Sequence, residues 1–177
     1  MTRASGYARG EDDWYQETPE CVDRFLDAER FSGVIWDPAC GEGNIPKRCR
    51  IRGYETAGTD IRDRGYGDVR DFLKTPLSAT DNIVTNPPFN LAQPFVERAL
   101  DLARRKVAIV ARLAFLESRA RRPFFQSTPL ARVWVHSSRV SMPPGGRDIP
   151  AKGGSVAYCW LVWERGHVGP PTLGWLP

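Results

Sequence analysis

The chain has 177 residues, of which 41% are hydrophobic and 26% charged, a composition typical of globular domains and not of disordered segments. No apolar run reaches the roughly 18 residues that a membrane-spanning helix needs, and the polar N-terminus lacks the apolar stretch of a secretory signal. The 4 cysteines stand far apart without a CxxC pair, so we expect reduced thiols, no bound metal and a cytoplasmic location.

The first expected element is a helix that begins near Thr18. Residues 1–13 are polar and contain glycine, so we expect a flexible tail there. Thr18 is suited to the N-cap of the helix and Pro19 to its first position. Gly33 ends the segment. Three apolar residues recur at helical spacing, namely Val22, Phe25 and Leu26.

Short strands and helices alternate through the middle of the chain. Apolar runs predict strands over 34–36, 56–61, 82–85 and 106–111. We expect one helix from about residue 44 to Arg52 and another that begins at Asn90, where Asn90 and Gln93 resemble a capping box. The last of these strands is apolar almost throughout, as in a sheet that is covered on both faces.

The last third of the chain has a different pattern. We expect a helix around 115–126 and then two strands rich in aromatic residues, 132–140 and 156–164. The Pro- and Gly-rich loop 141–155 between them suits an antiparallel pair at one end of a sheet. Alternating strands and helices followed by a hairpin predict an α/β fold with a doubly wound, mostly parallel sheet.

The formal net charge of +4 is unevenly distributed along the chain. Residues 1–97 hold 12 Lys and Arg against 17 Asp and Glu, whereas residues 98–152 hold 12 Lys and Arg against 3 Asp and Glu. A basic block of this density favours a polyanionic partner such as nucleic acid. A solvated, arginine-rich surface is the alternative.

A glycine-containing turn, DPACGEG (37–43), follows the first expected strand and opens the next helix. Gly41 and Gly43 permit a close backbone approach at the sheet edge. Asp37 suits a ligand with a positive group better than a pyrophosphate, and Asp60 can accept hydrogen bonds from ribose hydroxyls. With a third acid in the following segment GDVRDF, the pattern indicates a nucleoside that carries an ammonium group. An ordinary cap and a turn residue are the alternatives for Asp37 and Asp60.

The sequence Asn86-Pro87-Pro88-Phe89 is the most specific signal in the chain. It follows an expected strand, and in a 3-2-1-4-5 strand order it lies beside the glycine turn. An exocyclic amino nitrogen of a base is a poor nucleophile because its lone pair is delocalised into the ring. The Asn86 side-chain oxygen and the Pro87 carbonyl can accept hydrogen bonds from its two N–H groups and so localise that lone pair, and the prolines preset both acceptors. Phe89 can stack on a flipped base.

These motifs resemble those of the S-adenosylmethionine-dependent DNA adenine-N6 methyltransferases. DPACGEGN (37–44) resembles their motif I, NPPF their motif IV, and WYQETPE (14–20) the motif that precedes motif I. The resemblance covers about residues 14–111, with a weaker similarity to small phage and prophage enzymes over 112–165. It implies a Rossmann-like methyltransferase sheet and a bacterial or phage-infected cell. The length of the chain leads us to expect a single methyltransferase domain over 14–177 without a separate target-recognition domain.

The resemblance also implies roles for individual residues. The residues expected to hold the target base and act in catalysis are Asn86, Pro87, Pro88 and Phe89. The residues expected to bind the cofactor, S-adenosylmethionine, are Tyr15, Thr18, Asp37, Pro38, Ala39, Cys40, Gly41, Asp60, Ile61, Asp71, Phe72 and Asn86. Asp71 is expected to accept from the cofactor adenine, with Asp68 as the competing choice.

The enzymes that the chain resembles usually carry an added target-recognition domain. Without one, substrate contacts are expected from the loop 141–155 and from five arginines, namely Arg119, Arg121, Arg122, Arg139 and Arg147. Phosphate contacts of this kind position a nucleic acid without reading its sequence. A homo-oligomer or a separate specificity partner is another source of recognition.

Methylation of adenine N6 in DNA is the leading interpretation of these residues. An RNA base, cytosine N4 or the side-chain amide of a protein glutamine poses the same lone-pair problem, so each is an alternative substrate. A nucleic-acid-binding relative without catalysis is a further hypothesis. The basic block and the DPACG form of motif I favour a nucleic acid, most of all DNA.

Overall fold

The computed structural model describes residues 14–76, 78–146 and 156–177. The expected tail over 1–13, part of the expected loop 141–155 and Arg147 lie outside the described residues. Along the chain the elements are α1 (Pro19–Ala28), β1 (Ile35–Asp37), α2 (Asn44–Ile51), β2 (Thr56–Asp60), β3 (Asp68–Val69), β4 (Thr80–Thr85), the 3-10 turn η2 (Phe89–Leu91), α3 (Ala92–Leu102), β5 (Ala103–Arg112), the 3-10 turn η3 (Leu113–Phe115), α4 (Arg122–Ser127), β6 (Leu130–His136), β7 (Tyr158–Glu164) and β8 (Thr172–Leu176).

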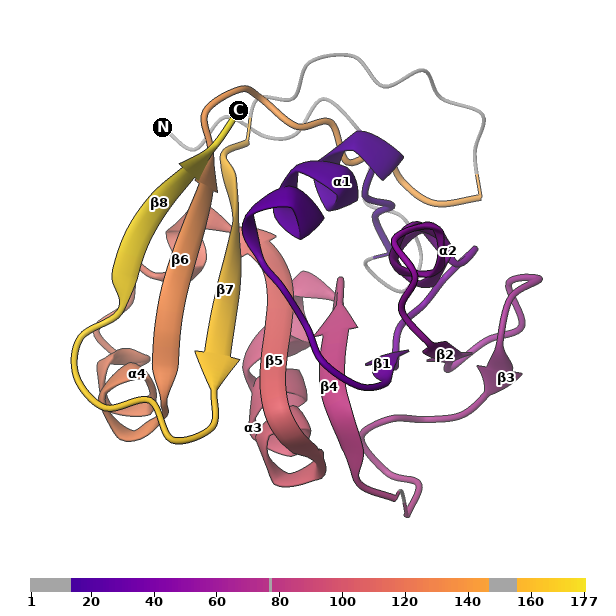
Figure 1. Ribbon diagram of the computed structural model, residues 1–177, viewed down its shortest axis with the longest axis horizontal. Coiled ribbons are helices and arrows are strands. Elements are labelled where there is room, and N and C mark those ends of the chain that lie inside the picture. The colour runs from indigo at the N-terminus through magenta and orange to yellow at the C-terminus, as the bar shows by residue number, and fades with distance from the viewer. Residues whose placement is uncertain (1–13, 77, 147–155) are drawn as a thin grey trace.

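These strands form one eight-stranded sheet in the order β3-β2-β1-β4-β5-β7-β6-β8 (Figure 1). β1 pairs in parallel with both β2 and β4, so that Ile35 lies opposite Thr56 on one side and Asn82 on the other. The boundary between β1 and β4 is therefore the switch point of a doubly wound sheet, where ligands bind beyond the carboxyl ends of the strands. The predicted α/β fold with a mostly parallel sheet is confirmed.

The antiparallel part of the sheet differs in detail from the expected hairpin. β6 and β7 are antiparallel, as predicted, but β7 lies between β5 and β6 and pairs with both. The edge strand β8 was not predicted from the sequence and pairs in parallel with β6. Gly174 makes this pairing feasible because a Cβ there would lie only 2.3 Å from the ring of Trp134.

Helices cover both faces of the sheet. α1 and α2 lie on the front face in Figure 1, and α3 and α4 lie behind it. Phe25 of α1 stacks on Trp160 of β7, with ring centroids 4.1 Å apart. On the other face Phe124 of α4 packs near Trp163 at 6.1 Å. The two tryptophans are three residues apart on β7, so their side chains point to opposite faces of the sheet. Each one belongs to the hydrophobic core on its own face.

A buried carboxylate fastens the end of α1 to the sheet. Glu29 accepts hydrogen bonds from Lys106, Arg132 and Trp134. Burial opposes its charge, but the hydrogen bonds from Arg132, Lys106 and Trp134 outweigh burial and hold the pKa of this carboxyl below its usual value. The ionised carboxylate therefore stabilises the contact between α1 and the strands.

Two local predictions about helix starts have different outcomes. Thr18 caps α1 as predicted, since its Oγ1 accepts the N–H of Cys21 at 3.3 Å. The capping box at Asn90 is wrong, because η2 precedes α3 and Gln93 instead donates to Glu97 at 2.9 Å.

The helix expected over 115–126 is in fact two short elements, η3 and α4. Pro123 lies in the first turn of α4, the part of a helix in which a missing N–H is tolerated. None of the helices in the described part of the chain is long and apolar enough to cross a membrane.

A matched pair of tryptophans tests this core. Trp160 is 0% exposed and Trp175 is 65% exposed. We predict that Trp160→Ala lowers the free energy of unfolding by about 3–5 kcal/mol, because it opens a cavity against Phe25. Trp175→Ala is expected to cost less than about 1 kcal/mol. Urea denaturation followed by circular dichroism measures both, and equal losses would contradict the assignment of Trp160 to the core.

Candidate active site

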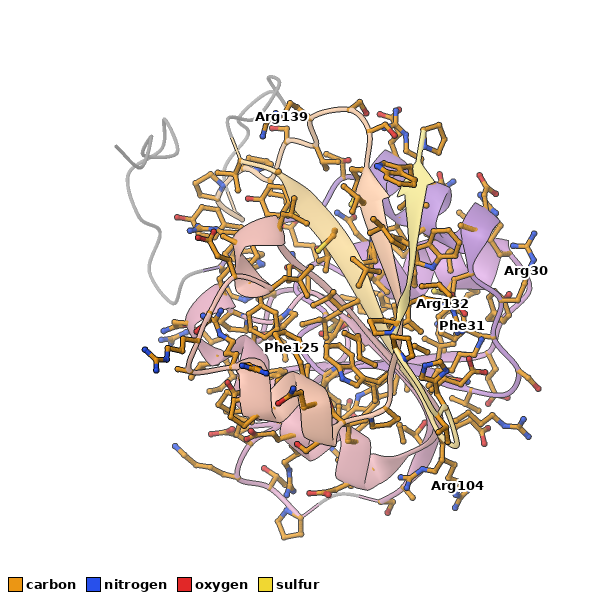
Figure 2. All side chains as sticks on the ribbon, turned by 90° about the vertical axis from the view of Figure 1, so that its left-hand side faces the viewer. Arg30, Phe31, Arg104, Phe125, Arg132 and Arg139 are labelled. Atoms are coloured by element: carbon orange, nitrogen blue, oxygen red, sulfur yellow. The ribbon has the colours of Figure 1, made fainter. Side chains whose placement is uncertain are left out.

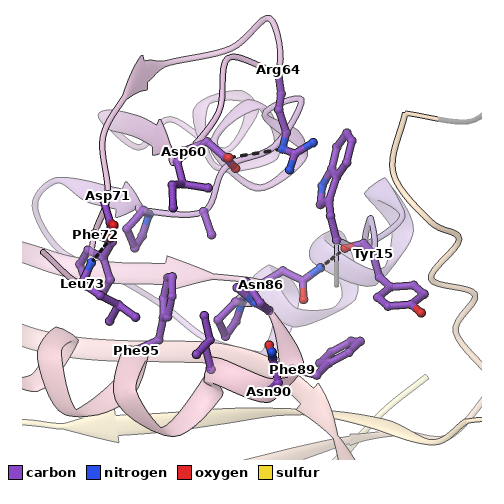
Figure 3. A pocket seen from close by; sticks show the side chains of 17 residues that line it. Tyr15, Asp60, Arg64, Asp71, Phe72, Leu73, Asn86, Phe89, Asn90 and Phe95 are labelled. Atoms are coloured by element: carbon purple, nitrogen blue, oxygen red, sulfur yellow. Dashed lines mark hydrogen bonds and ion pairs between the residues drawn. The ribbon is translucent and has the colours of Figure 1, made fainter. Parts of the chain in front are cut away.

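A cavity of about 420 Å³ lies at the edge of the sheet where β1, β2 and β4 end. Its wall consists of Trp14, Tyr15, Pro38, Ala39, Asp60, Ile61, Arg64, Asp71, Phe72, Leu73, Asn86, Pro87, Pro88, Phe89, Asn90, Leu91 and Phe95. Figure 3 shows Asp71, Leu73 and Phe95 toward one end of the cavity, Asn86 and Tyr15 toward the other, and Asp60 between them.

Asp60 is held at the end of β2 by three donors. Its carboxylate accepts the N–H of Gly41 at 2.9 Å and that of Arg62 at 3.1 Å, and it pairs with Arg64 at 3.3 Å. A carboxylate offers about four acceptor positions, so these contacts leave room for a further donor. The guanidinium of Arg64 also stacks over the ring of Trp14 at 3.7 Å.

Asp71, not Asp68, is the acid in the cavity wall. Its Oδ1 accepts the N–H of Leu73 at 3.0 Å, and Lys74 lies 3.4 Å from its Oδ2. The side chain of Asp68 is 78% exposed and pairs with Arg70 on the outer strand β3. Of the two acids in the GDVRDF segment, only Asp71 is in position to contact a ligand in this cavity.

The glycine turn supplies the cavity with Pro38 and Ala39 only. The backbone N–H groups of Ala39, Cys40 and Gly41 donate within the chain, to Asp37 at 3.1 Å, to the Thr59 carbonyl at 2.9 Å and to Asp60 at 2.9 Å. Four predicted cofactor residues are therefore absent from the cavity wall, namely Thr18, Asp37, Cys40 and Gly41. The Thr18 hydroxyl instead caps α1.

Asn86 has its amide group oriented by two acceptors. It is 9% exposed, and its Nδ2 donates to the Tyr15 carbonyl at 2.7 Å and to Oε2 of Glu17 at 2.8 Å. In Figure 3 the side-chain oxygen of Asn86 lies on the side away from Tyr15. The geometry thus leaves Oδ1, an acceptor, available to a ligand.

Phe89 belongs to an aromatic cluster at the same end. Its ring stacks with Tyr15 at 5.6 Å and 27°, and lies 5.9 Å from Tyr158. The guanidinium of Arg112 lies 4.6 Å from the Phe89 ring, and its Nε is buried without a hydrogen-bond partner among the described residues. A planar ligand that stacks on Phe89 must share this ring with these neighbours.

Four of the five arginines that were predicted to contact the substrate lie in the described part of the chain, and none of these four lines the cavity. Arg121 donates to the Phe115 carbonyl at 2.7 Å, and its guanidinium lies 4.6 Å from the centre of the same residue's ring. Arg119, between η3 and α4, and Arg122, the first residue of α4, are exposed and follow the carboxyl end of β5. Arg139, near the top of the molecule in Figure 2, is exposed. It lines a smaller hollow together with residues of α1 such as Glu20 and Arg24.

Several residues of the site were not predicted from the sequence. The residues in the wall or in direct contact with Asn86 that had no assigned role are Trp14, Glu17, Arg64, Leu73, Asn90, Leu91 and Phe95. The first two lie inside the WYQETPE motif, which was the available signal. Over the residues that the structure describes, no group of three or more His, Cys, Asp or Glu is placed to hold a metal.

The segment that carries Trp14 covers the cavity by pairing with a distant loop. Gln16 donates its N–H to the Pro143 carbonyl at 2.9 Å, and Gly145 donates to the Trp14 carbonyl at 3.1 Å. A Cβ on Gly145 would lie 2.2 Å from the indole of Trp14, so this loop needs glycine there. We define residues 14–16 and 143–145 together as the closing ladder.

No family model and no curated protein matches the sequence. The fold is similar to that of a candidate RNA methyltransferase from Pyrococcus horikoshii, with a TM-score of 0.66, 14% identity, and coverage of 92% of this chain and 94% of that one. It is also similar to the M protein of the type I restriction enzyme EcoKI, with a TM-score of 0.60 and 14% identity over 90% of this chain and 45% of that one.

A third similar structure is the magnesium protoporphyrin IX methyltransferase of Synechocystis with bound SAH. Its TM-score is 0.55 and its identity 14%, over 84% of this chain and 83% of that one. These similarities establish the fold: the chain has the Rossmann-like fold of these methyltransferases.

The buried carboxyl of Glu17 makes stability depend on pH. Glu17 is 6% exposed, and burial raises its pKa from 4.5 to about 7, against the opposing hydrogen bond from Asn86. The folded chain therefore holds this proton more tightly than the unfolded chain. It follows that the contribution of Glu17 to the free energy of unfolding falls as pH rises from about 4.5 to about 7.

We predict that Glu17→Gln removes this dependence. Relative to the wild type, the variant should gain up to about 3 kcal/mol of unfolding free energy between about pH 4.5 and about pH 8. Urea titrations at both pH values measure the difference. The exposed Glu20→Gln serves as the matched control, and a Glu17→Gln variant with the wild-type pH dependence would contradict the prediction.

Proposed function

We propose that this protein is an S-adenosylmethionine-dependent methyltransferase that modifies the N6 amino group of adenine in DNA. The observation that carries the proposal is the fixed amide of Asn86, which presents an acceptor oxygen at the end of β4 in the same cavity as Asp60 and Asp71. The likeness to a candidate RNA methyltransferase and to a restriction-enzyme M protein supports a nucleic-acid substrate.

The size of the cavity and several groups in its wall support the binding of the cofactor there. Its volume of about 420 Å³ lies within the range of small-molecule sites, roughly 300–1,000 Å³. Asp71 would accept from the adenine amino group, Ile61 and Phe72 would pack on the adenine ring, and Asp60 would accept from a ribose hydroxyl. When bound, S-adenosylmethionine supplies a methyl group on a positively charged sulfur.

The carboxyl groups behind the cavity favour a cationic ligand. Burial raises the pKa of Asp37 well above its usual value, and the nearby acids Glu17 and Asp60 add to the effect. A bound ammonium group and a sulfonium would offset this concentration of acids. The acids of the site therefore fit S-adenosylmethionine better than they fit an anionic dinucleotide.

The residues of the NPPF segment act on the target amino group. Asn86 Oδ1 and the Pro87 carbonyl accept hydrogen bonds from its two N–H groups, which localises the lone pair on nitrogen. Because both acceptors are preset, little reorganisation is needed in the transition state. After methylation the nitrogen is acidic and loses one proton to Asn86, Pro87 or water. Phe89, with Tyr15 and Tyr158 near its ring, offers a stacking surface for the base.

Incubation of the protein with labelled S-adenosylmethionine and separate pools of DNA, RNA and protein tests the proposal. We expect label in DNA, with N6-methyladenine as the modified nucleoside by mass spectrometry. Label in RNA or on protein glutamine would contradict DNA as the substrate and identify RNA or protein in its place. No transfer to any pool, with cofactor bound, would refute the catalytic function.

Two variants separate catalysis from cofactor binding. We predict that Asn86→Ala lowers kcat by about 100- to 1,000-fold, because an acceptor of the amino proton is removed, and leaves the affinity for S-adenosylmethionine within about threefold. Asp60→Ala should instead weaken that affinity by about tenfold or more, since a buried carboxylate acceptor is removed. Calorimetry and single-turnover rates measure the two effects, and parallel losses in both variants would contradict the roles.

The exposed arginines after β5 are predicted to contact phosphates. Removing Arg119 and Arg122 together should weaken DNA binding and reduce the slope of log K against log salt by roughly 0.9 for each phosphate that is no longer neutralised. Arg104 is also exposed but lies near the start of β5, at the opposite end of that strand, so Arg104→Ala is the control. Fluorescence anisotropy over a salt series measures the slope, and an unchanged slope would place the DNA elsewhere.

A further inference from the structure

Glu17 is a buried acid that touches the reacting end of the site without lining the cavity. It lies between Tyr15 and the start of α1, and it is 6% exposed. Its own carbonyl accepts Nδ2 of Asn44, at the start of α2, at 2.8 Å. Its side chain accepts Nδ2 of Asn86 at 2.8 Å. Glu17 is therefore held at its backbone by Asn44 and at its side chain by Asn86.

The amide of Asn86 has two orientations, and only one can serve the reaction. In the observed orientation Nδ2 donates both protons, to the Tyr15 carbonyl and the Glu17 carboxylate, and Oδ1 is left over. The flipped orientation would press Oδ1 against two acceptors and turn a donor toward an incoming NH₂ group. An ionised carboxylate at position 17 cannot donate, so it excludes the flip. A protonated one can donate to Oδ1 and weakens that exclusion.

We propose that Glu17 is a positioning residue whose carboxylate holds the Asn86 amide with its oxygen toward the target amino group. The inference rests on the proposed function and extends it to a residue outside the NPPF segment. The carboxylate also polarises the amide, because a charged acceptor on Nδ2 shifts electron density toward Oδ1. Both effects act through Asn86, and neither requires Glu17 to touch the substrate.

The surroundings of Glu17 set the pH at which it acts. Asp37 at the end of β1, Cys21 on α1 and Cys40 in the glycine turn are the titratable groups that interact with it, and Asn86 is its hydrogen-bonding neighbour. With its pKa raised to about 7 by burial, Glu17 changes charge near neutrality. The expected kcat therefore rises as pH increases through about 7, where the carboxylate forms.

The kinetic test compares Glu17→Gln and Glu17→Ala with Glu20→Gln as the matched control. We expect Glu17→Ala to lower kcat on the order of 100-fold through misplacement of Asn86, with the dissociation constant for S-adenosylmethionine within about threefold. Glu17→Gln retains an acceptor oxygen, so it should recover part of kcat but lose the rise near pH 7. Wild-type kcat in Glu17→Ala, a loss confined to KM, or an unaltered pH profile in Glu17→Gln would overturn the proposal.

A second readout does not require turnover. The side-chain amide protons of Asn86, assigned by their disappearance in Asn86→Ala, should shift in NMR spectra with one titration near pH 7 and show no such titration in Glu17→Gln. Absence of that titration in the wild type would overturn the positioning role even if DNA is methylated. A clear titration in a protein that methylates no pool would instead refute the proposed function, and with it any role of Glu17 in methyl transfer.

Discussion

The parallel pairing of β1 with both β2 and β4 is the constraint on which the site depends. It brings the carboxyl ends of three strands to one edge of the sheet, although Asp37, Asp60 and Asn86 are far apart in the chain. Each of these side chains is buried, so the sheet fixes their spacing before any ligand arrives. The helices then close both faces, with Phe25 on Trp160 in one core and Phe124 near Trp163 in the other.

The sequence predicts those parts of the structure whose cause is local. A strand that ends in an acid or in NPPF is specified by neighbouring residues, as is the cap at Thr18, and the structure has both. The closing ladder and the insertion of β7 between β5 and β6 depend on contacts between distant segments, which no window of the sequence contains. The role of Glu17 is not visible in the sequence for the same reason: its partner, Asn86, lies 69 residues further along.

Some arginines of this protein form internal contacts, whereas several acids are buried behind the cavity. The arginine-rich composition suggested a surface for polyanions, yet Arg121 and Arg132 direct their donors inside the protein, to the Phe115 carbonyl and to Glu29. The acids, in contrast, gather behind the cavity, where burial raises the pKa of both Glu17 and Asp37. A count of charges along a sequence cannot separate these cases, because the difference lies in what each side chain touches after folding.

The closing ladder joins residues 14–16 to residues 143–145, two segments that lie far apart in the chain. During synthesis the first strand of this ladder leaves the ribosome long before the second exists. The carbonyl of Tyr15 and the amide of Asn86 can meet earlier, but the wall that includes Trp14 is complete only after Gly145 has emerged. A growing chain therefore carries an open, unfinished pocket, and the enclosed site arises late in translation.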